Sequence, residues 1–160
     1  MPPGNLSFRK RQKQKHLFKM NVLVIDVGGT NVKMLATGQQ ESIKFPSGPA
    51  MTAKAMVAGV KKRTRDWKYD VISVGYPGPV LRGCPKAEPR NLAPGWVGFD
   101  FEAAFERPVK IINDAAMQAL GSYNGGTMLF LGLGTSSSPP SYRRQAHFVG
   151  CVRRPLRLAL

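Results

Sequence analysis

Cysteine is scarce in this chain of 160 residues, which contains only two. So few cysteines exclude a disulfide-rich scaffold and a zinc site with four cysteine ligands. No apolar run approaches the roughly 20 residues that a membrane-spanning helix requires. A secretory signal is not expected either, because no compact apolar stretch follows the basic N-terminal residues. The sequence therefore predicts a cytoplasmic protein with no membrane partner.

Acidic residues are also few, nine against 24 basic ones, and the formal net charge is +15. The excess lies in two segments without any acid, residues 1–20 with six basic residues and residues 136–160 with five. Residues 21–135 keep 13 basic and nine acidic residues, an ordinary mixed surface. Acid-free basic segments can bind nucleic acid through phosphate contacts, but they are more often simply solvated. Nucleic acid is therefore not the expected partner.

The chain divides into three zones by composition. Residues 1–19 are polar and basic without an apolar period, which predicts a disordered leader. Residues 20–135 alternate strand and helix signals. Residues 136–160 open with Ser-Ser-Ser-Pro-Pro and show neither strand alternation nor a helical face, which predicts a basic, irregular tail.

Apolar periodicity in the middle zone predicts individual strands and helices. Strands are expected over Val22–Ile25, Val32–Ala36, Ser42–Phe45, Val71–Val74, Val109–Ile112 and Met128–Leu131. Helices are expected over Ala50–Arg65, Phe99–Phe105 and Asp114–Tyr123. Three leading strands joined by hairpins and followed by crossovers imply an α/β fold, with one mixed sheet, a leading antiparallel meander and helices on both faces.

The first candidate site is the turn Asp26-Val27-Gly28-Gly29-Thr30-Asn31, between two predicted strands. Two adjacent glycines permit a positive φ and let backbone N–H groups approach a bulky anion. Thr30 and Asn31 add side-chain donors, and Asp26 at the end of a buried strand could hold Mg²⁺ directly or through water. The alternative is a tight turn that Asp26 only caps.

A second candidate is Asn113-Asp114, which follows the strand Val109–Ile112 and begins a helix. A carboxylate at the carboxyl end of such a strand lies where open α/β sheets bind their ligands. Asp114 could take a proton from a substrate hydroxyl, as phosphoryl transfer to an alcohol requires. The alternative is structural, because Asn and Asp are preferred helix N-caps.

Two weaker signals lie in other loops. Gly132-Leu133-Gly134-Thr135 is a second glycine-rich turn after a strand, and it could face the same polyphosphate group from the opposite side. Asn91 and Trp96 lie on a proline-stiffened loop. That loop is equally consistent with a sugar-binding lid and with a plain connection.

The order of these segments resembles the ROK family of sugar kinases, within the actin–hexokinase–Hsp70 superfamily. Over Met20–Thr135, the diglycine hairpin is followed by Gly-Tyr-Pro-Gly, Asn-Leu-x-x-x-Trp, Asn-Asp-Ala and Gly-x-Gly-Thr. Among these kinases the chain is most similar to bacterial glucokinases, including those described as polyphosphate-using. The resemblance implies a ribonuclease H-like (actin-like ATPase) sugar-kinase lobe at residues 20–126 and the first strand of a second lobe at 127–135.

The resemblance also implies a role for each matching residue. Asp114 would be the catalytic base for the 6-hydroxyl of glucose or a related hexose, which Asn91 and Asn113 would contact. Asp26 would lie near Mg²⁺. Phosphate would be bound by Gly28, Gly29, Thr30, Asn31, Gly132, Gly134 and Thr135. The implied reaction is phosphoryl transfer from ATP or polyphosphate to the sugar, and a homodimer is left open.

The resemblance ends abruptly after Thr135, where Ser-Ser-Ser-Pro-Pro and a basic tail replace the family's later sugar motif and second lobe. His147 lacks that sugar motif, and Cys84 and Cys151 have no partners at zinc spacing. We expect a truncated or out-of-frame C-terminal segment and reduced kinase activity. The alternative is a non-catalytic sugar-binding protein, or a ROK-type regulator whose basic tails contact nucleic acid. Residues 1–19 are, however, too short for a helix-turn-helix.

Overall fold

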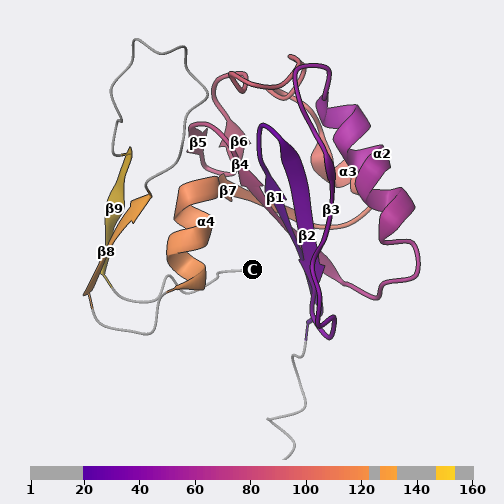
Figure 1. The fold of residues 1–160 in the computed structure, drawn as a ribbon, viewed down its shortest axis with the longest axis horizontal. Helices are drawn as coiled ribbons and strands as arrows, with labels where there is room; N and C mark the ends of the chain where they lie inside the picture. Colours follow the sequence, from indigo (N-terminus) through magenta and orange to yellow (C-terminus); the bar gives the residue numbers. More distant parts are fainter. Residues whose placement is uncertain (1–19, 123–126, 133–146, 154–160) are drawn as a thin grey trace, which may run out of the picture.

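Five strands form the central sheet of the computed structural model, which describes residues 20–122, 127–132 and 147–153 (Figure 1). The strands are β1 (Val22–Val27), β2 (Asn31–Ala36), β3 (Ile43–Pro46), β4 (Val71–Tyr76) and β7 (Val109–Asn113). Their spatial order is β3-β2-β1-β4-β7. β1, β2 and β3 pair antiparallel, whereas β4 runs parallel to both β1 and β7. The predicted leading meander and mixed sheet are therefore confirmed.

Alternation along the strands places the hydrophobic core on one face of this sheet. In β1, Leu23, Ile25 and Val27 are fully buried, while Val24 on the other face is 37% exposed. Successive side chains of a strand point to opposite faces, so the register partners on β2 and β4 continue this division. The apolar period of the sequence thus decides which face becomes the core.

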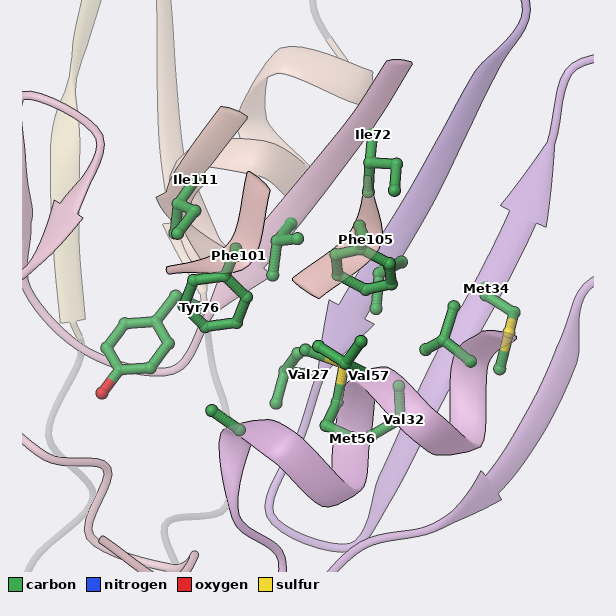
Figure 2. Packing of buried hydrophobic residues seen from close by; sticks show 14 of the residues in the cluster. Val27, Val32, Met34, Met56, Val57, Ile72, Tyr76, Phe101, Phe105 and Ile111 are labelled. Carbon is green, nitrogen blue, oxygen red and sulfur yellow. The ribbon is translucent and has the colours of Figure 1, made fainter. Parts of the chain in front are cut away.

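Helices cover both faces of the sheet. α2 (Ala53–Arg63) and α3 (Phe101–Phe105) lie on the core face, and Figure 2 shows the apolar side chains packed between them and the strands. α4 (Asp114–Gly121) packs on the other face against β4 and β7. It can do so because residue 75 is a glycine. A Cβ at this position would overlap the end of the Met117 side chain. The predicted helices on both faces are confirmed.

α2 begins where its residue types indicate a helix start. The Thr52 hydroxyl oxygen accepts a hydrogen bond from the N–H of Ala55 at 3.2 Å, which is the arrangement of an N-cap. Three basic residues occupy the last turn, where positive charge complements the helix dipole. Because this cap sets the first helical residue, α2 is shorter than the predicted Ala50–Arg65.

A small hairpin lies inside the segment predicted as a proline-stiffened loop. β5 (Val80–Leu81) and β6 (Cys84–Pro85) pair antiparallel. The two residues between them, Arg82 and Gly83, both have positive φ, as a tight two-residue hairpin turn requires. Arginine rarely takes this conformation, so the residue type at the first turn position does not signal the hairpin.

The prediction of an irregular tail over residues 136–160 is wrong for part of that segment. His147–Arg153 forms β9, which pairs antiparallel with β8 (Thr127–Gly132) in a separate two-stranded sheet. Backbone pairing explains the difference, because β8 has N–H and C=O groups to satisfy, a need that local alternation does not reveal. The predicted leader and the rest of the tail lie outside the described residues. Among the helices described, none is long and apolar enough to span a membrane.

Candidate active site

Two carboxylates meet at the carboxyl ends of the parallel strands. Asp26 on β1 pairs with Gly75 on β4, and Gly75 pairs with Ile112 on β7. Asp114 begins α4 two residues after Ile112, and its Cα lies 3.5 Å from the point where a Cβ on Gly75 would stand. The first turn of α4 thus lies against β4 at Gly75, and the absence of a side chain there leaves room for Met117. This approach brings Asp114 within electrostatic reach of Asp26.

Asp26 is half-buried on the face of the sheet opposite the core. Burial, the largest influence, raises its pKa above the ordinary 3.8. The positive charge of Lys33, its register partner on β2, lowers the pKa, and the charge of Asp114 raises it again. A bound cation would stabilise the ionised forms of these two neighbouring carboxylates, one of which is partly desolvated.

The donor atoms at this edge suit Mg²⁺. Carboxylate oxygens are hard ligands, and proteins commonly hold Mg²⁺ with one or two carboxylates together with waters and substrate phosphates. Asp26 supplies one carboxylate, and Asp114 adds a second negative charge nearby. The described ranges contain no group of three acidic, histidine or cysteine side chains that would form a complete metal site. The residues present therefore fit an ion that is shared with a phosphate group.

Asp26→Asn is expected to raise the thermal midpoint at pH 7 by a few degrees. A carboxyl group with a raised pKa adds stability that is complete below its unfolded pKa and is lost as the pH rises through its folded pKa. Ionised Asp26 therefore opposes folding at pH 7, and the amide removes that charge without changing the shape of the side chain. Thermal denaturation should show that the difference between the two midpoints disappears below about pH 4.

The control for this experiment is Asp66→Asn, because Asp66 is highly exposed and pairs only with exposed Arg65 among the described residues. Surface ion pairs of this kind contribute little. We expect the control to match the wild-type midpoint at each pH. A midpoint for Asp26→Asn below that of the wild type at pH 7 would contradict the burial argument.

The diglycine bend between β1 and β2 is shaped by close contacts. A Cβ on Gly28 would lie 2.9 Å from the carbonyl oxygen of Asn31, and one on Gly29 would lie 3.0 Å from the Cβ of Asn91. Neither glycine has a positive φ, so the left-handed conformation that the pair permits is not used. A side chain at position 28 would collide with the backbone of Asn31, whereas one at position 29 would require Asn91 to give way by a few tenths of an ångström. The second contact also brings Asn91 to the bend.

Ser47 holds this bend from the end of β3. Its hydroxyl donates to the Gly28 carbonyl at 2.6 Å, and its N–H donates to the Thr30 carbonyl at 2.9 Å. The N–H of Gly28 donates to the Asn31 carbonyl at 3.0 Å. The N–H groups of Gly29 and Thr30 donate to no acceptor within the part of the chain that the structure describes. Two such donors on a fixed bend can bind an anion.

Asn113 has the structural role that its residue type allows. Its Oδ1 accepts the N–H of Ala116 at 3.2 Å as the N-cap of α4, and its Nδ2 donates to the Gly78 carbonyl at 3.0 Å. Asp114 Oδ1 accepts the N–H of Ala115 at 2.8 Å. The cap is therefore confirmed, and the sugar contact of Asn113 stays a prediction.

The proline-stiffened loop places one of its two candidate residues in the core and the other at the candidate site. Trp96 is fully buried, and its ring centroid lies 5.8 Å from that of Tyr76 and 6.3 Å from that of Phe101. The prediction of a sugar-binding lid that uses this indole is therefore wrong, because the ring belongs to the hydrophobic core. Asn91, by contrast, is exposed and lies against Gly29. Its sugar contact stays a prediction.

The second predicted phosphate turn is described only in part. Gly132 is the last residue of β8. Gly134 and Thr135 lie outside the described residues. The phosphate contacts of these three residues stay predictions.

Sequence reasoning missed two residues that shape this region. Gly75 follows a predicted strand, and a glycine at a strand end indicates a turn as readily as a close helix approach. Glu88 accepts three backbone N–H groups of the proline-rich loop. A signal for Glu88 was present, because it is the only acidic residue in the stretch 71–99.

Comparisons with known proteins find likeness only among solved structures. No family model and no curated protein matches the chain. A sugar-kinase candidate from Cytophaga hutchinsonii is 28% identical with a TM-score of 0.56, over 72% of this chain and 45% of that one. A ROK family protein from Streptococcus pneumoniae, solved in complex with sucrose, is 22% identical with a TM-score of 0.53, over 72% of this chain and 44% of that one.

A third structure, an N-acetylmannosamine kinase candidate from Listeria monocytogenes, is 23% identical with a TM-score of 0.51, over 64% of this chain and 38% of that one. This chain thus spans less than half the length of each of these three structures. One of these neighbours is thus described as a ROK family protein, and the other two as candidate sugar and N-acetylmannosamine kinases. They confirm the predicted α/β, ribonuclease H-like fold class.

Proposed function

We propose that this chain forms the sugar-binding lobe of a ROK-type kinase, which transfers a phosphoryl group to a hexose hydroxyl. One observation carries the proposal: Asp114 lies beside Asp26 at the sheet edge that also holds the diglycine bend. Two carboxylates next to an anion-binding bend are the groups that phosphoryl transfer to an alcohol needs. The sugar-kinase neighbours of the fold support this proposal.

In this proposal Asp114 is the base. Its carboxylate is held at the first turn of α4, where the side-chain cap by Asn113 fixes the start of the helix. A sugar hydroxyl that donates a hydrogen bond to this carboxylate would lose its proton to Asp114 as the phosphoryl group arrives. Asn91 at the diglycine bend would bind a further sugar hydroxyl and so orient the ring.

The bend binds the phosphoryl donor in the same proposal. The N–H groups of Gly29 and Thr30 would donate to phosphate oxygens, next to Asn31. Asp26, with Asp114 nearby, would hold Mg²⁺, which when bound neutralises charge on the phosphate oxygens. Gly132, Gly134 and Thr135 would approach the donor from the second turn.

We further propose glucose as the hexose, its 6-hydroxyl as the acceptor, and ATP or polyphosphate as the donor. The order of the motifs supports these choices, because it resembles that of bacterial glucokinases. A cytoplasmic location follows from the same proposal, because an ATP-dependent sugar kinase acts where its donor is made. The competing possibility is a non-catalytic sugar-binding protein.

A two-step titration of the purified chain tests the proposal. Calorimetry should show glucose binding that Asp114→Asn weakens about tenfold or more, since the variant loses a hydrogen bond to a charged acceptor. Asp66→Asn should bind as the wild type does, because Asp66 is exposed and pairs with Arg65. Absence of glucose binding by the folded wild type would overturn the sugar site.

The second step adds Mg²⁺ with ATP or with polyphosphate to the glucose-loaded chain. We expect binding of one donor, and a hexose phosphate that mass spectrometry detects with the wild type and not with Asp114→Asn. Glucose binding without donor binding and without product would favour the non-catalytic sugar-binding protein instead.

A further inference from the structure

Glu88 closes the loop that presents Asn91 to the diglycine bend. Its Oε2 accepts the N–H groups of Gly95 at 3.1 Å and Trp96 at 3.0 Å, and its Oε1 accepts the N–H of Val97 at 3.2 Å. Both oxygens of one carboxylate therefore join the two ends of the segment 88–97, which we name the Glu88 loop. Hydrogen bonds to a charged acceptor are about twice as strong as those between neutral groups.

Further contacts fasten the Glu88 loop to the core. The Tyr76 hydroxyl, which Figure 2 shows pointing out of the core cluster, donates to the Ala87 carbonyl at 2.7 Å. The carbonyl of Met51, just before α2, accepts both the N–H of Ala93 at 3.1 Å and Nε1 of Trp96 at 3.3 Å. Both sides of the loop are anchored in this way, and the segment between them carries the candidate sugar residue.

The apex of the Glu88 loop touches the diglycine bend. Asn91 is exposed, and its Cβ and Nδ2 would lie 3.0 Å and 3.3 Å from a Cβ on Gly29. A shift of the loop by one ångström would change where this amide points. The carboxylate that closes the loop has no hydrogen bond to Asn91, so any effect on this residue would pass through the loop backbone.

We propose that Glu88 is a positioning residue of the candidate sugar site, which acts by closing the Glu88 loop and holding Asn91 at the diglycine bend. Loop closure is argued from the hydrogen bonds alone, whereas its effect on sugar binding rests on the proposed function. The ionised carboxylate is required, because it offers acceptors only. A glutamine has the same shape, but its amide nitrogen is a donor and would face a backbone N–H.

The charge state of Glu88 agrees with this role. Desolvation pushes its pKa up, but the hydrogen bonds from Trp96, Val97 and Gly95 outweigh it and leave the pKa below the ordinary 4.5. Closure is therefore complete above about pH 4.5 and is lost as the pH falls through the lowered pKa. Tyr76 faces the same carboxylate; burial and then the Glu88 charge raise its pKa to about 12, so the phenol stays neutral over this range.

Amide hydrogen exchange, followed by NMR on the full chain, tests loop closure. In Glu88→Gln the amides of Gly95, Trp96 and Val97 should exchange about tenfold faster or more than in the wild type. Amides of β1 should exchange at the wild-type rate. The control is Glu41→Gln, which removes an exposed carboxylate outside the loop. Unchanged exchange at the three amides would overturn the proposal.

A second measurement needs no variant and covers the case in which Glu88→Gln does not fold. In the wild type, the chemical shifts of the three amides should titrate together with a midpoint below pH 4.5. Amide shifts that show no common midpoint there would mean that Glu88 does not close the loop.

Glucose titration separates this proposal from the proposed function. If the wild type binds glucose, Glu88→Gln should weaken binding about three- to tenfold, and Glu41→Gln should leave it unchanged. Faster loop exchange with unchanged glucose affinity would overturn the positioning role. If the wild type binds no glucose while the exchange result holds, the proposed function fails and loop closure stands.

Discussion

Trp96→Ala is expected to lower the free energy of unfolding by about 3–5 kcal/mol. The side chain is fully buried between Tyr76 and Phe101, so its removal leaves a large cavity. It also deprives the Met51 carbonyl of the indole Nε1–H that donates to it at 3.3 Å. A loss of this size is a large part of the roughly 5–15 kcal/mol that stabilises a typical domain. Urea unfolding followed by circular dichroism measures it.

Two further variants make this experiment specific. Trp96→Phe keeps an aromatic ring in the core and should cost less than the alanine variant. Val97→Ala, in the same loop but 46% exposed, should stay within about 0.5 kcal/mol of the wild type. Equal stability of Trp96→Ala and Val97→Ala would show that the loop does not contribute to the core.

Gly75→Val is expected to destabilise the domain by about 1–3 kcal/mol and to abolish the glucose binding proposed above. A Cβ at this position would overlap the Met117 methyl, lie 3.0 Å from the Met117 sulfur and lie 3.5 Å from the Cα of Asp114. The Met117 side chain can turn aside, but the backbone of α4 at Asp114 cannot. The added methyl groups therefore push the start of α4, and with it the Asp114 carboxylate, away from Asp26.

Urea unfolding and calorimetric titration with glucose measure the two effects together. Gly75→Ala should be milder, because its single methyl meets mainly the flexible end of Met117. Gly121→Ala is the matched control, since a Cβ at Gly121, the last residue of α4, would meet no atom within 4 Å. If Gly75→Val kept the stability and the glucose affinity of the wild type, the close approach of α4 to β4 would not be needed for the site.

Local patterns were sufficient to predict the central sheet. The β-branched run Val22–Ile25, the diglycine break and the run Val32–Ala36 indicate a hairpin, and β1 and β2 form it. β4 and β7 also lie where apolar runs predict them. The segment His147–Arg153 escapes this reasoning, because β9 depends on a partner strand rather than on its own alternation.

The candidate site could be predicted in outline and not in detail. Asp114 was expected at the carboxyl end of its strand, where open α/β sheets bind ligands, and it lies there, within electrostatic reach of Asp26. The roles of single side chains were harder to predict. Trp96 has the residue type of a sugar-stacking aromatic, yet it is a core residue. Glu88 looks like a solvated loop charge, yet it closes the loop.

The sequence alone determined the order of elements, the face of the sheet that becomes the core, and the end of the sheet where polar residues collect. These properties follow from period and chain order, which are local. Only the tertiary structure decided that Gly75 makes room for α4, that Asn91 reaches Gly29 and that Trp96 is buried. Each of these depends on which atoms meet across tens of residues of intervening chain, and packing at that range has no local sequence signal.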